Sequence, residues 1–444
     1  MARIKKELGF SWLIVLIVAL LISLSLYDLS PGFSANTKTL LEKGQTKDIP
    51  PTSMWLELGV DGVPIARLIT RASSCPVIVT DGQSHPMEIR LRPTDEFPVL
   101  VCEYKIPIAI KSIQINGKSL PLLKPNPQKI AVIGDTGCRL KGKSIQNCND
   151  PKQWPFKEIA ETVANWKPDL IIHVGDYLYR ETPCPKNDSG CAASAYGDFW
   201  QAWQDDFFSP SDKLLPVAPW IVARGNHELC NRGGRGWFYL LDPRSLSAQC
   251  QNYTEPYSVS LGDFDIVVMD SALANDLKAI PEQVEVYAKQ FKQIESMTTG
   301  PSWLLVHRPI WGMGQTIQQG QPKVYTANYT LQAASENHLP PLISFVLSGH
   351  IHMFEILGFE DKRPIQSITG NSGTALDASL SVPIKGIEIA QTKSVGGTSI
   401  GKFGFMTLER KGHNSKHWIA KARGVDGLPQ ATCEIENLQV ICKT

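Results

Sequence analysis

The sequence predicts an α/β fold that follows a small all-β domain, and three observations lead to this prediction. From Lys129 onward, short apolar runs alternate with segments of helical spacing, a pattern typical of parallel strands connected by helices. Several of these runs are apolar without interruption, as expected of strands buried on both faces. Before Pro125, short apolar segments are separated by turn residues, and no stretch has helical periodicity.

The small all-β domain is expected to be β-sandwich-like and to span residues 52–126. Turn signals such as Asp81-Gly82 and Asn116-Gly117 separate its candidate strands. These strands are Met54–Val60, Ile65–Thr70, Pro76–Thr80, Met87–Leu91, Val99–Tyr104 and Ile110–Ile115. The region holds no constellation of reactive side chains, which favours a role in packing or presentation.

The α/β domain is expected to span residues 127–444. The spacing of apolar residues predicts helices over Phe156–Trp166, Gly197–Phe208 and Glu282–Met297, the last begun by Pro281. Buried strands are predicted at Ile130–Ile133, Leu170–Val174, Trp220–Ala223, Phe264–Met269, Trp303–Val306 and Phe345–Leu347. Four later strands are expected to form a second sheet packed on the first: Phe354–Leu357, Pro364–Ile368, Phe403–Leu408 and Trp418–Ala422.

Residues 1–35 have the features of a signal peptide or a signal anchor. Arg3, Lys5 and Lys6 precede an apolar run from Leu8 to about Tyr27. The run approaches the ~20 residues that span a bilayer, so cleavage and retention as a membrane anchor both remain open. Residues 36–51 are polar and are expected to form a linker. Either outcome predicts that the rest of the chain is exported, whether periplasmic, secreted or membrane-anchored outside the cytoplasm.

Ten cysteines agree with export. They fall in couples that are close in sequence: Cys75 and Cys102, Cys138 and Cys148, Cys184 and Cys191, Cys230 and Cys250, Cys433 and Cys442. Pairing within these couples gives five disulfides in an oxidising compartment, although the sequence leaves the connectivity open. The rival interpretation is a thiolate metal site, and the lack of a CxxC motif argues against it.

The net charge bears on nucleic-acid binding, and three sequons bear on glycosylation. The formal net charge of +1 provides no basic field that would attract nucleic acid, so no nucleic-acid partner is required. Three Asn-x-Ser/Thr sequons, at Asn187, Asn252 and Asn328, are glycosylation sites only where the host glycosylates exported proteins.

Five short motifs carry the chemistry, and each comes just after an apolar run. They are Gly134-Asp135-Thr136-Gly137, Gly175-Asp176-Tyr177-Leu178-Tyr179, Gly225-Asn226-His227-Glu228, Leu304-Leu305-Val306-His307 and Gly349-His350-Ile351-His352. One motif alone is weak evidence because Gly-Asp pairs are common in turns, but the ordered set is a strong signal. Ligands bind outside the carboxyl ends of strands in open α/β sheets, so five such loops are expected to converge on one pocket.

The motifs supply seven side chains suited to a pair of metal ions: Asp135, Asp176, Tyr179, Asn226, His307, His350 and His352. Carboxylate and phenolate oxygens suit hard, highly charged ions, and imidazole suits zinc, iron and manganese. A free tyrosine has a pKa near 10, so Tyr179 is expected to bind as a phenolate only beside a strongly acidic metal. Trivalent iron is the natural candidate.

The ordered motifs resemble the metallophosphoesterase (calcineurin-like phosphoesterase) superfamily, and specifically its purple acid phosphatase branch. Ordinary members carry Asp-x-His in the first motif, where this chain has Asp135-Thr136-Gly137. Purple acid phosphatases lack the same histidine and carry Gly-Asp-x-x-Tyr, which stands here as Gly175 to Tyr179. The resemblance covers Lys129 to about Asp377 and implies a metallophosphoesterase β-sandwich core flanked by helices, in α/β/β/α order.

The resemblance also implies a division of the ligands between two metal ions. Asp135, Asp176, Tyr179 and His352 would hold Fe(III), whereas Asp176, Asn226, His307 and His350 would hold a divalent ion, which is Zn, Mn or Fe. Asp176 would bridge the two. A hydroxide between the metals would then attack the phosphorus in line. His227 would position the phosphate and protonate the leaving oxygen.

One departure from the family concerns the substrate side of this site. Plant-type members carry further histidines shortly after the fourth motif, whereas residues 312–320 here contain none. The leaving-group preference and the acidic pH optimum therefore stay open. Arg139 and Arg308 flank motifs and are candidates for bidentate phosphate binding. His173 is expected either to support a ligand from behind or to be a satisfied core histidine, and Glu228 is expected to support its loop and not to react.

The sequence therefore predicts an exported, metal-dependent phosphatase that hydrolyses phosphate monoesters of small substrates. A phosphodiesterase or nucleotide hydrolase with the same site is the second reading. A membrane-anchored binding protein without turnover is the third, and the presence of all seven candidate ligands argues against it.

Overall fold

The computed structural model describes residues 53–412 and 415–443. The expected signal segment (1–35) and linker (36–51) lie outside these residues. Within the part of the chain that is described, none of the helices is both long and apolar enough to cross a membrane.

The first sheet has eleven strands and runs through both regions that the sequence separates. Its order is β27-β26-β25-β24-β9-β12-β13-β1-β2-β6-β5. The three central strands β9, β12 and β13 are parallel. The strands are β1 (Ser53–Leu58), β2 (Pro64–Thr70), β5 (Glu88–Leu91), β6 (Leu100–Lys105), β9 (Lys129–Ile133), β12 (Leu170–His173), β13 (Trp220–Val222), β24 (Gly404–Arg410), β25 (His417–Gly424), β26 (Pro429–Glu436) and β27 (Gln439–Lys443).

The second sheet has eight strands in the order β14-β15-β16-β19-β21-β20-β23-β22. Its strands β15, β16, β19 and β21 are parallel. The strands are β14 (Tyr257–Ser260), β15 (Asp265–Val268), β16 (Ser302–Leu305), β19 (Ile343–Ser348), β20 (Phe354–Phe359), β21 (Ile365–Thr369), β22 (Glu388–Ile389) and β23 (Thr392–Ile400).

This division corrects the sequence-based assignment of strands to sheets. The strands predicted at 264–269, 303–306 and 345–347 belong to the second sheet, not to the first. The strands predicted at 403–408 and 418–422 belong to the first sheet, where β24 pairs antiparallel with β9 and β25 pairs with β24. The predicted strands 354–357 and 364–368 do lie in the second sheet.

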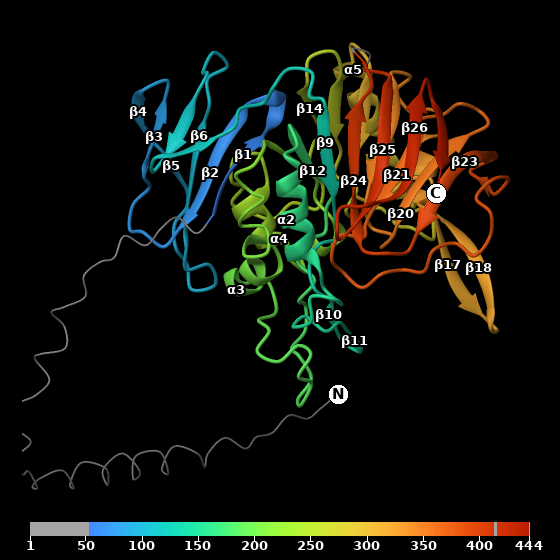
Figure 1. Ribbon diagram of the computed structural model, residues 1–444, viewed down its shortest axis with the longest axis horizontal. Helices are drawn as coiled ribbons and strands as arrows, with labels where there is room; N and C mark the ends of the chain where they lie inside the picture. Colours follow the sequence, from blue (N-terminus) through green and yellow to red (C-terminus); the bar gives the residue numbers. More distant parts are fainter. Residues whose placement is uncertain (1–52, 413–414, 444) are drawn as a thin grey trace, which may run out of the picture. The chain divides into compact units, whose positions relative to one another are not determined.

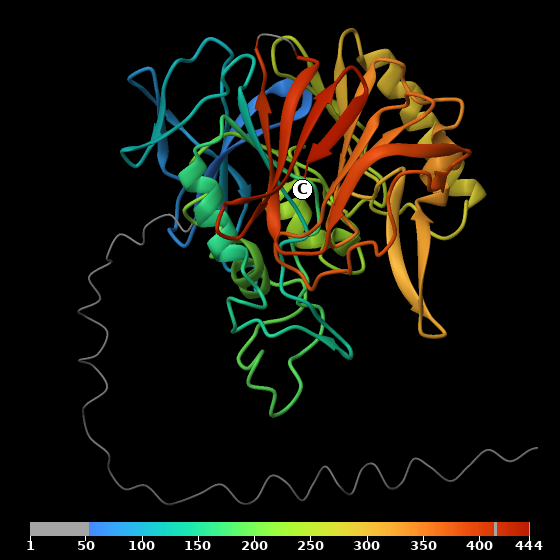
Figure 2. The same ribbon diagram turned by 45° about the vertical axis from the view of Figure 1, so that its right-hand side comes forward.

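Helices cover the outer faces of both sheets, which gives the α/β/β/α order. The helical elements are η1 (Val60–Gly62), α2 (Phe156–Trp166), α3 (Trp200–Trp203), the π-helical turn η2 (Gln204–Phe208), η3 (Asn226–Glu228), α4 (Gly234–Gly236), the π-helical turn η4 (Trp237–Leu241), α5 (Pro281–Met297) and α6 (Tyr329–Ser335). Figure 1 shows α2, α3 and α4 gathered beside β12, and Figure 2 brings α5 into view beside the second sheet.

Side-chain alternation along the strands explains the three apolar layers. In β9, Ala131 and Ile133 pack against the helices that carry Phe156 and Trp203. Ile130 and Val132 point the other way, into the layer between the two sheets. A third layer packs α5 and α6 against the outer face of the second sheet. Strands covered on both faces need apolar residues at every position, as the uninterrupted runs predicted.

Residues 53–120 form two layers of strands. A four-stranded sheet, in the order β4-β3-β7-β8, faces the β1-β2-β6-β5 end of the first sheet across a small apolar core. Its strands are β3 (Val77–Thr80), β4 (Gln83–Pro86), β7 (Ile113–Ile115) and β8 (Lys118–Leu120). The sandwich-like arrangement agrees with the sequence, but the first sheet is continuous across residue 126. The division into two domains stays a prediction.

Buried charges join these N-terminal strands to the helical layer. Arg67 on β2 pairs with Glu57 on β1, and both side chains are fully buried. The same guanidinium donates to the carbonyls of Leu240 (3.1 Å) and Asp242 (3.1 Å), where η4 ends. Arg67 therefore satisfies orphan helix-end carbonyls as well as a buried carboxylate.

Two short hairpins leave the loops that follow the motif strands. One is β10 (Leu140–Lys141) with β11 (Ser144–Ile145), just after the first motif. The other is β17 (Gly312–Gln318) with β18 (Gln321–Ala327), just after the fourth. Both project on the same side in the two views (Figures 1 and 2). The histidine-free stretch 312–320 is thus the first strand and turn of a hairpin.

All ten cysteines form disulfides, and the five bonds join the predicted neighbours. None of the cysteines is left free for a thiolate metal site. The rival interpretation of the cysteines is therefore wrong, because every sulfur is bonded to its partner.

Candidate metal centre

Five loops from two sheets bring the seven predicted ligands together. The loops after β9, β12 and β13 carry Asp135, Asp176, Tyr179 and Asn226. The loops after β16 and β19 carry His307, His350 and His352. The first sheet thus contributes the oxygen donors and the second sheet contributes the imidazoles. The expectation that one sheet holds all five loops is wrong, and the site lies where the carboxyl ends of two sheets meet.

The Tyr179 hydroxyl is the centre of a first group of donors. It lies 2.8 Å from Asp135 Oδ1, 2.9 Å from Asp176 Oδ2 and 3.0 Å from His352 Nε2. The ring is fully buried. These four side chains come from the first, second and fifth motifs.

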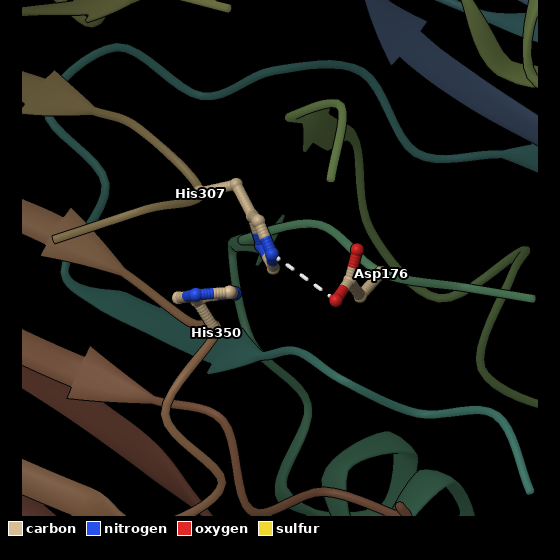
Figure 3. A group of neighbouring side chains, drawn as sticks. All are labelled: Asp176, His307 and His350. Carbon is tan, nitrogen blue, oxygen red and sulfur yellow. Dashed lines mark ion pairs between the residues drawn. The ribbon is translucent and has the colours of Figure 1, made fainter. Parts of the chain in front are cut away.

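Asp176 belongs equally to a second group. Its Oδ2 lies 3.1 Å from His307 Nε2, and the same nitrogen lies 3.1 Å from Asn226 Oδ1. Ligand atoms of Asp176, His307 and His350 all lie within 4.8 Å of one another. Figure 3 shows the three side chains pointing toward a common space, with the His307–Asp176 contact dashed. The two groups therefore share Asp176 alone.

Hydrogen bonds outside the cluster orient His307. Its Nδ1 lies 2.9 Å from the carbonyl oxygen of Val174. Because a carbonyl only accepts, Nδ1 carries a proton, and Nε2 is the nitrogen that faces Asp176 and Asn226. A histidine whose far nitrogen donates to a carbonyl is the usual arrangement for a metal ligand.

The donor set suits metal cations because its hydrogen-bond acceptors outnumber the protons available to them. Tyr179 has one proton to share among Asp135, Asp176 and His352. Burial and the charges of both carboxylates raise the pKa of Tyr179 well above its usual value, so the phenol keeps its proton unless a metal ion replaces it. Buried carboxylates need paired charge, and metal ions at this cluster would supply it.

His227 lies against the first group with one nitrogen turned inward. Its ring packs on Tyr179 at a centroid distance of 3.7 Å. Nδ1 lies 2.8 Å from Glu181 Oε1 and 3.0 Å from the carbonyl oxygen of Leu178, so Nδ1 carries a proton. Nε2 lies 3.9 Å from Asp176 Oδ2. Burial lowers the pKa of His227 to about 4.

The Glu228 carboxylate holds two of the motif loops together. It accepts hydrogen bonds from the backbone N–H groups of Asp176 (3.1 Å), Tyr177 (2.8 Å), Leu178 (3.1 Å) and Gly225 (3.0 Å). Glu228 is fully buried and lies behind the ligands. It therefore supports the loops, as the sequence suggested, and positions Asp176.

Three of the predicted ligands have a strained backbone. Asp135 (φ 54°), Asp176 (φ 61°) and His350 (φ 73°) all adopt the left-handed conformation, which costs about 1–3 kcal/mol for a non-glycine residue. Such strain persists only where surrounding contacts enforce it. Close approach adds a second constraint, because a Cβ on Gly225 would lie 2.1 Å from Asp176 Oδ1.

Three arginines surround the cluster. Arg139 Nη2 lies 3.0 Å from His352 Nδ1, and Arg232 donates to the carbonyl oxygen of Asn226 (2.9 Å). Arg308 Nη1 lies 2.8 Å from His350 Nε2. Arg139 and Arg308, the two predicted phosphate-binding candidates, thus both lie beside predicted ligands. Three guanidinium groups suit an anionic substrate.

Comparison with known proteins identifies the family. A model of the calcineurin-like phosphoesterase family matches residues 128–354, just over half of the 444 residues. The chain belongs to the calcineurin-like phosphoesterase family. It is therefore a hydrolase of phosphoric ester bonds, and the five motifs lie within or beside the matched range.

Similar proteins place this phosphoesterase near the purple acid phosphatases. The chain is 23% identical over 378 residues to the probable purple acid phosphatase 20 of Arabidopsis thaliana, covering 77% of each protein. The structure of purple acid phosphatase PPD1 from yellow lupin (Lupinus luteus) seeds matches 86% of this chain and 74% of its own, with a TM-score of 0.58 and 13% identity. The structure of PhoD matches 89% and 93%, with a TM-score of 0.52 and 12% identity. The two structures share the fold.

Sequence reasoning missed four residues of this phosphoesterase site. Glu181 contacts His227 and pairs with Arg232. Asp206 accepts backbone N–H groups from the first two motif loops. Asp276 contacts His350. Glu181 and Arg232 follow their motifs by two and four residues, which was a usable signal. Asp276 follows a predicted strand. Asp206 lies in a helical segment, and nothing in the sequence around it indicates a role at the site.

Two further expectations can be compared with the phosphoesterase structure. His173 is a buried core histidine whose Nδ1 accepts from the Gly175 N–H (3.1 Å). Among the three sequons, Asn187 and Asn252 are exposed, whereas Asn328 is fully buried. Asn328 is therefore closed to glycosylation in the folded chain.

We expect Gly225→Ala to disable the site without unfolding the protein. The added methyl group would displace Asp176, and a misplacement of about 1 Å is enough to lower kcat/KM by about 100-fold. Gly300→Ala is the matched control, because a Cβ there meets nothing within 4 Å. Metal content and phosphoester hydrolysis would be measured for both variants. Equal values for the two variants would show that Gly225 and Asp176 do not constrain the site.

Proposed function

We propose that this phosphoesterase is an exported phosphatase that hydrolyses phosphate monoesters at a binuclear Fe(III)–M(II) centre. One observation carries the proposal: two groups of donors share a single carboxylate, Asp176. A bridging carboxylate between two donor sets is what a two-metal site about 3.5–4 Å across requires.

The charges of the two groups support different ions. Asp135, Asp176 and Tyr179 offer three anionic oxygens when the phenol is deprotonated, and His352 completes the set. Anionic oxygens suit a trivalent ion such as Fe(III). The second group adds only the neutral donors Asn226, His307 and His350 to the shared carboxylate, which suits Zn, Mn or Fe(II).

The metal ions, when bound, would supply an activated water nucleophile and neutralise charge on the phosphoryl group. The chain's own residues would bind the phosphate and protonate the leaving oxygen. Arg139 lies beside His352 of the first group, whereas Arg232 and Arg308 lie beside Asn226 and His350 of the second. A phosphate bound between these arginines would therefore meet positive charge from both groups.

His227 is the proposed general acid. Its Nε2 faces the cluster, whereas Nδ1 donates to Glu181. The protonated ring would give its Nε2 proton to the leaving oxygen and keep Nδ1–H, held by Glu181 and the Leu178 carbonyl. Because the pKa of His227 is lowered to about 4, the protonated ring is populated mainly at acidic pH. Glu181 is itself paired with Arg232, so this dyad keeps the His227 ring in one orientation.

Export is supported by the disulfides. Five bonds among ten cysteines are typical of proteins that fold in an oxidising compartment. The similarity to the probable purple acid phosphatase 20 of Arabidopsis thaliana supports an acid phosphatase activity for this chain.

Chromogenic esters test the substrate class. We expect the purified enzyme to hydrolyse p-nitrophenyl phosphate with a kcat/KM at least about tenfold above that for bis(p-nitrophenyl) phosphate, a difference of ~1.4 kcal/mol in the barrier. A monoester dianion carries more negative charge than a diester monoanion, so two metal cations and three arginines stabilise it more strongly. A preference for the diester would favour the phosphodiesterase alternative, and metal-loaded protein without turnover would favour a binding protein.

Colour tests the metal assignment. A tyrosinate bound to Fe(III) absorbs visible light, so we expect iron-loaded protein to be coloured and Tyr179→Phe to be colourless. Tyr177→Phe is the matched control, because the Tyr177 hydroxyl donates to the Ala223 carbonyl (3.1 Å) away from the ligands. A colourless, iron-free wild type with full activity would contradict Fe(III) at Tyr179.

A further inference from the structure

Asp276 lies beside His350 in the loop that follows β15. Its Oδ2 is 2.9 Å from His350 Nε2. Arg308 Nη1 is 2.8 Å from the same nitrogen and also pairs with Asp276. An arginine only donates, so His350 Nε2 cannot hydrogen-bond to both partners at once. When Nε2 carries a proton and donates to Asp276, Nδ1 keeps the lone pair.

Asp276 is itself held in place by buried groups. The Asn328 side-chain amide donates to Asp276 Oδ1 (2.8 Å) and to the Ala274 carbonyl (3.1 Å). Asn328 Oδ1 accepts from the Leu331 N–H (2.9 Å) and caps α6. The Tyr329 N–H donates to the Asp276 carbonyl (3.0 Å). Both carboxylate oxygens of Asp276 therefore have fixed partners, and α6 sets their position.

The other histidine of the fifth motif has a different neighbour. Asp377 Oδ2 accepts from the His352 backbone N–H (2.9 Å), but it lies 3.9 Å from the ring nitrogen Nδ1. The Asp377 side chain is 45% exposed, compared with 25% for Asp276. Of Asp276 and Asp377, only Asp276 is within hydrogen-bond distance of a histidine ring.

We propose that Asp276 is a positioning residue that turns His350 Nδ1 toward the divalent ion and sets the affinity of that ion. The inference rests on the proposed two-metal site. A carboxylate that accepts from the far nitrogen of a ligating histidine fixes its tautomer and ring orientation and raises its basicity, and loss of such a partner costs about 10- to 100-fold in metal affinity or activity. Asn328 contributes indirectly, because its side-chain amide holds the Asp276 carboxylate.

Asp276→Asn tests the proposal while keeping the size of the side chain. We expect the variant to keep the ion at Tyr179 and, once its divalent ion has been removed, to bind that ion about 10- to 100-fold more weakly than the wild type does. Titration with Zn(II) followed by calorimetry, together with metal content by mass spectrometry, measures both. Asp377→Asn is the matched control, and it should bind Zn(II) as the wild type does. A purely structural role would lower the Tm and the affinity for both ions together.

A double-mutant cycle shows whether Asp276 acts through the histidine. In a His350→Ala background, Asp276→Asn should cause no further loss of Zn(II) affinity. A full additional loss, or wild-type affinity in the single variant, would overturn the proposal. Failure of the proposed function is seen separately, because the wild type would then bind fewer than two ions.

Discussion

Asp176 is a buried carboxylate at the place where two sheets meet, and the organisation of the site follows from its burial. Only 1% of the residue is exposed. Burial works against ionisation, and the neighbouring His307 and His227 rings more than offset it, so the pKa of Asp176 lies well below its usual range. A buried charge of this kind needs partners from several directions. The oxygen donors of the first sheet and the imidazoles of the second provide them, and both contact Asp176 Oδ2.

The surrounding chain keeps this arrangement rigid. Glu228 and Asp206 are buried carboxylates that accept backbone N–H groups, and between them they hold the first three motif loops. Among the ligands with left-handed backbone, Asp176 donates its N–H to Glu228, and His350 donates its N–H to Asp135. Asp276 and Asn328 extend the same principle to the second sheet, where a side-chain network orients His350. Preorganised donors of this kind need no rearrangement when charge develops on a substrate.

The sequence predicted the elements and the ligand loops better than their assembly. Helix α2 was predicted with its exact bounds, and β9 and β12 to within one residue, because apolar periodicity and uninterrupted apolar runs reflect burial directly. The assignment of β24 to the first sheet was missed because its pairing with β9 joins residues far apart in sequence, such as Met406 and Val132. Its apolar pattern would suit either sheet.

The limits of sequence reasoning at the site have a similar cause. Residues in the five motifs were recognisable because a donor follows each buried run, and in four of the five motifs a glycine precedes that donor. Asp206 and Asp276 are single acids without a motif, and their contacts arise only from the packing of distant elements. Arg232 and Glu181 stood near motifs, but their pairing depends on the approach of two loops.

The central claim is that donors from two sheets enclose two metal ions joined by Asp176. A crystal structure of the metal-loaded protein, with anomalous scattering measured at the iron and zinc edges, tests it most directly. The account predicts two metal peaks about 3.5–4 Å apart, both within coordinating distance of Asp176, with Tyr179 on the iron. A single peak, or two peaks that do not share Asp176, would contradict it.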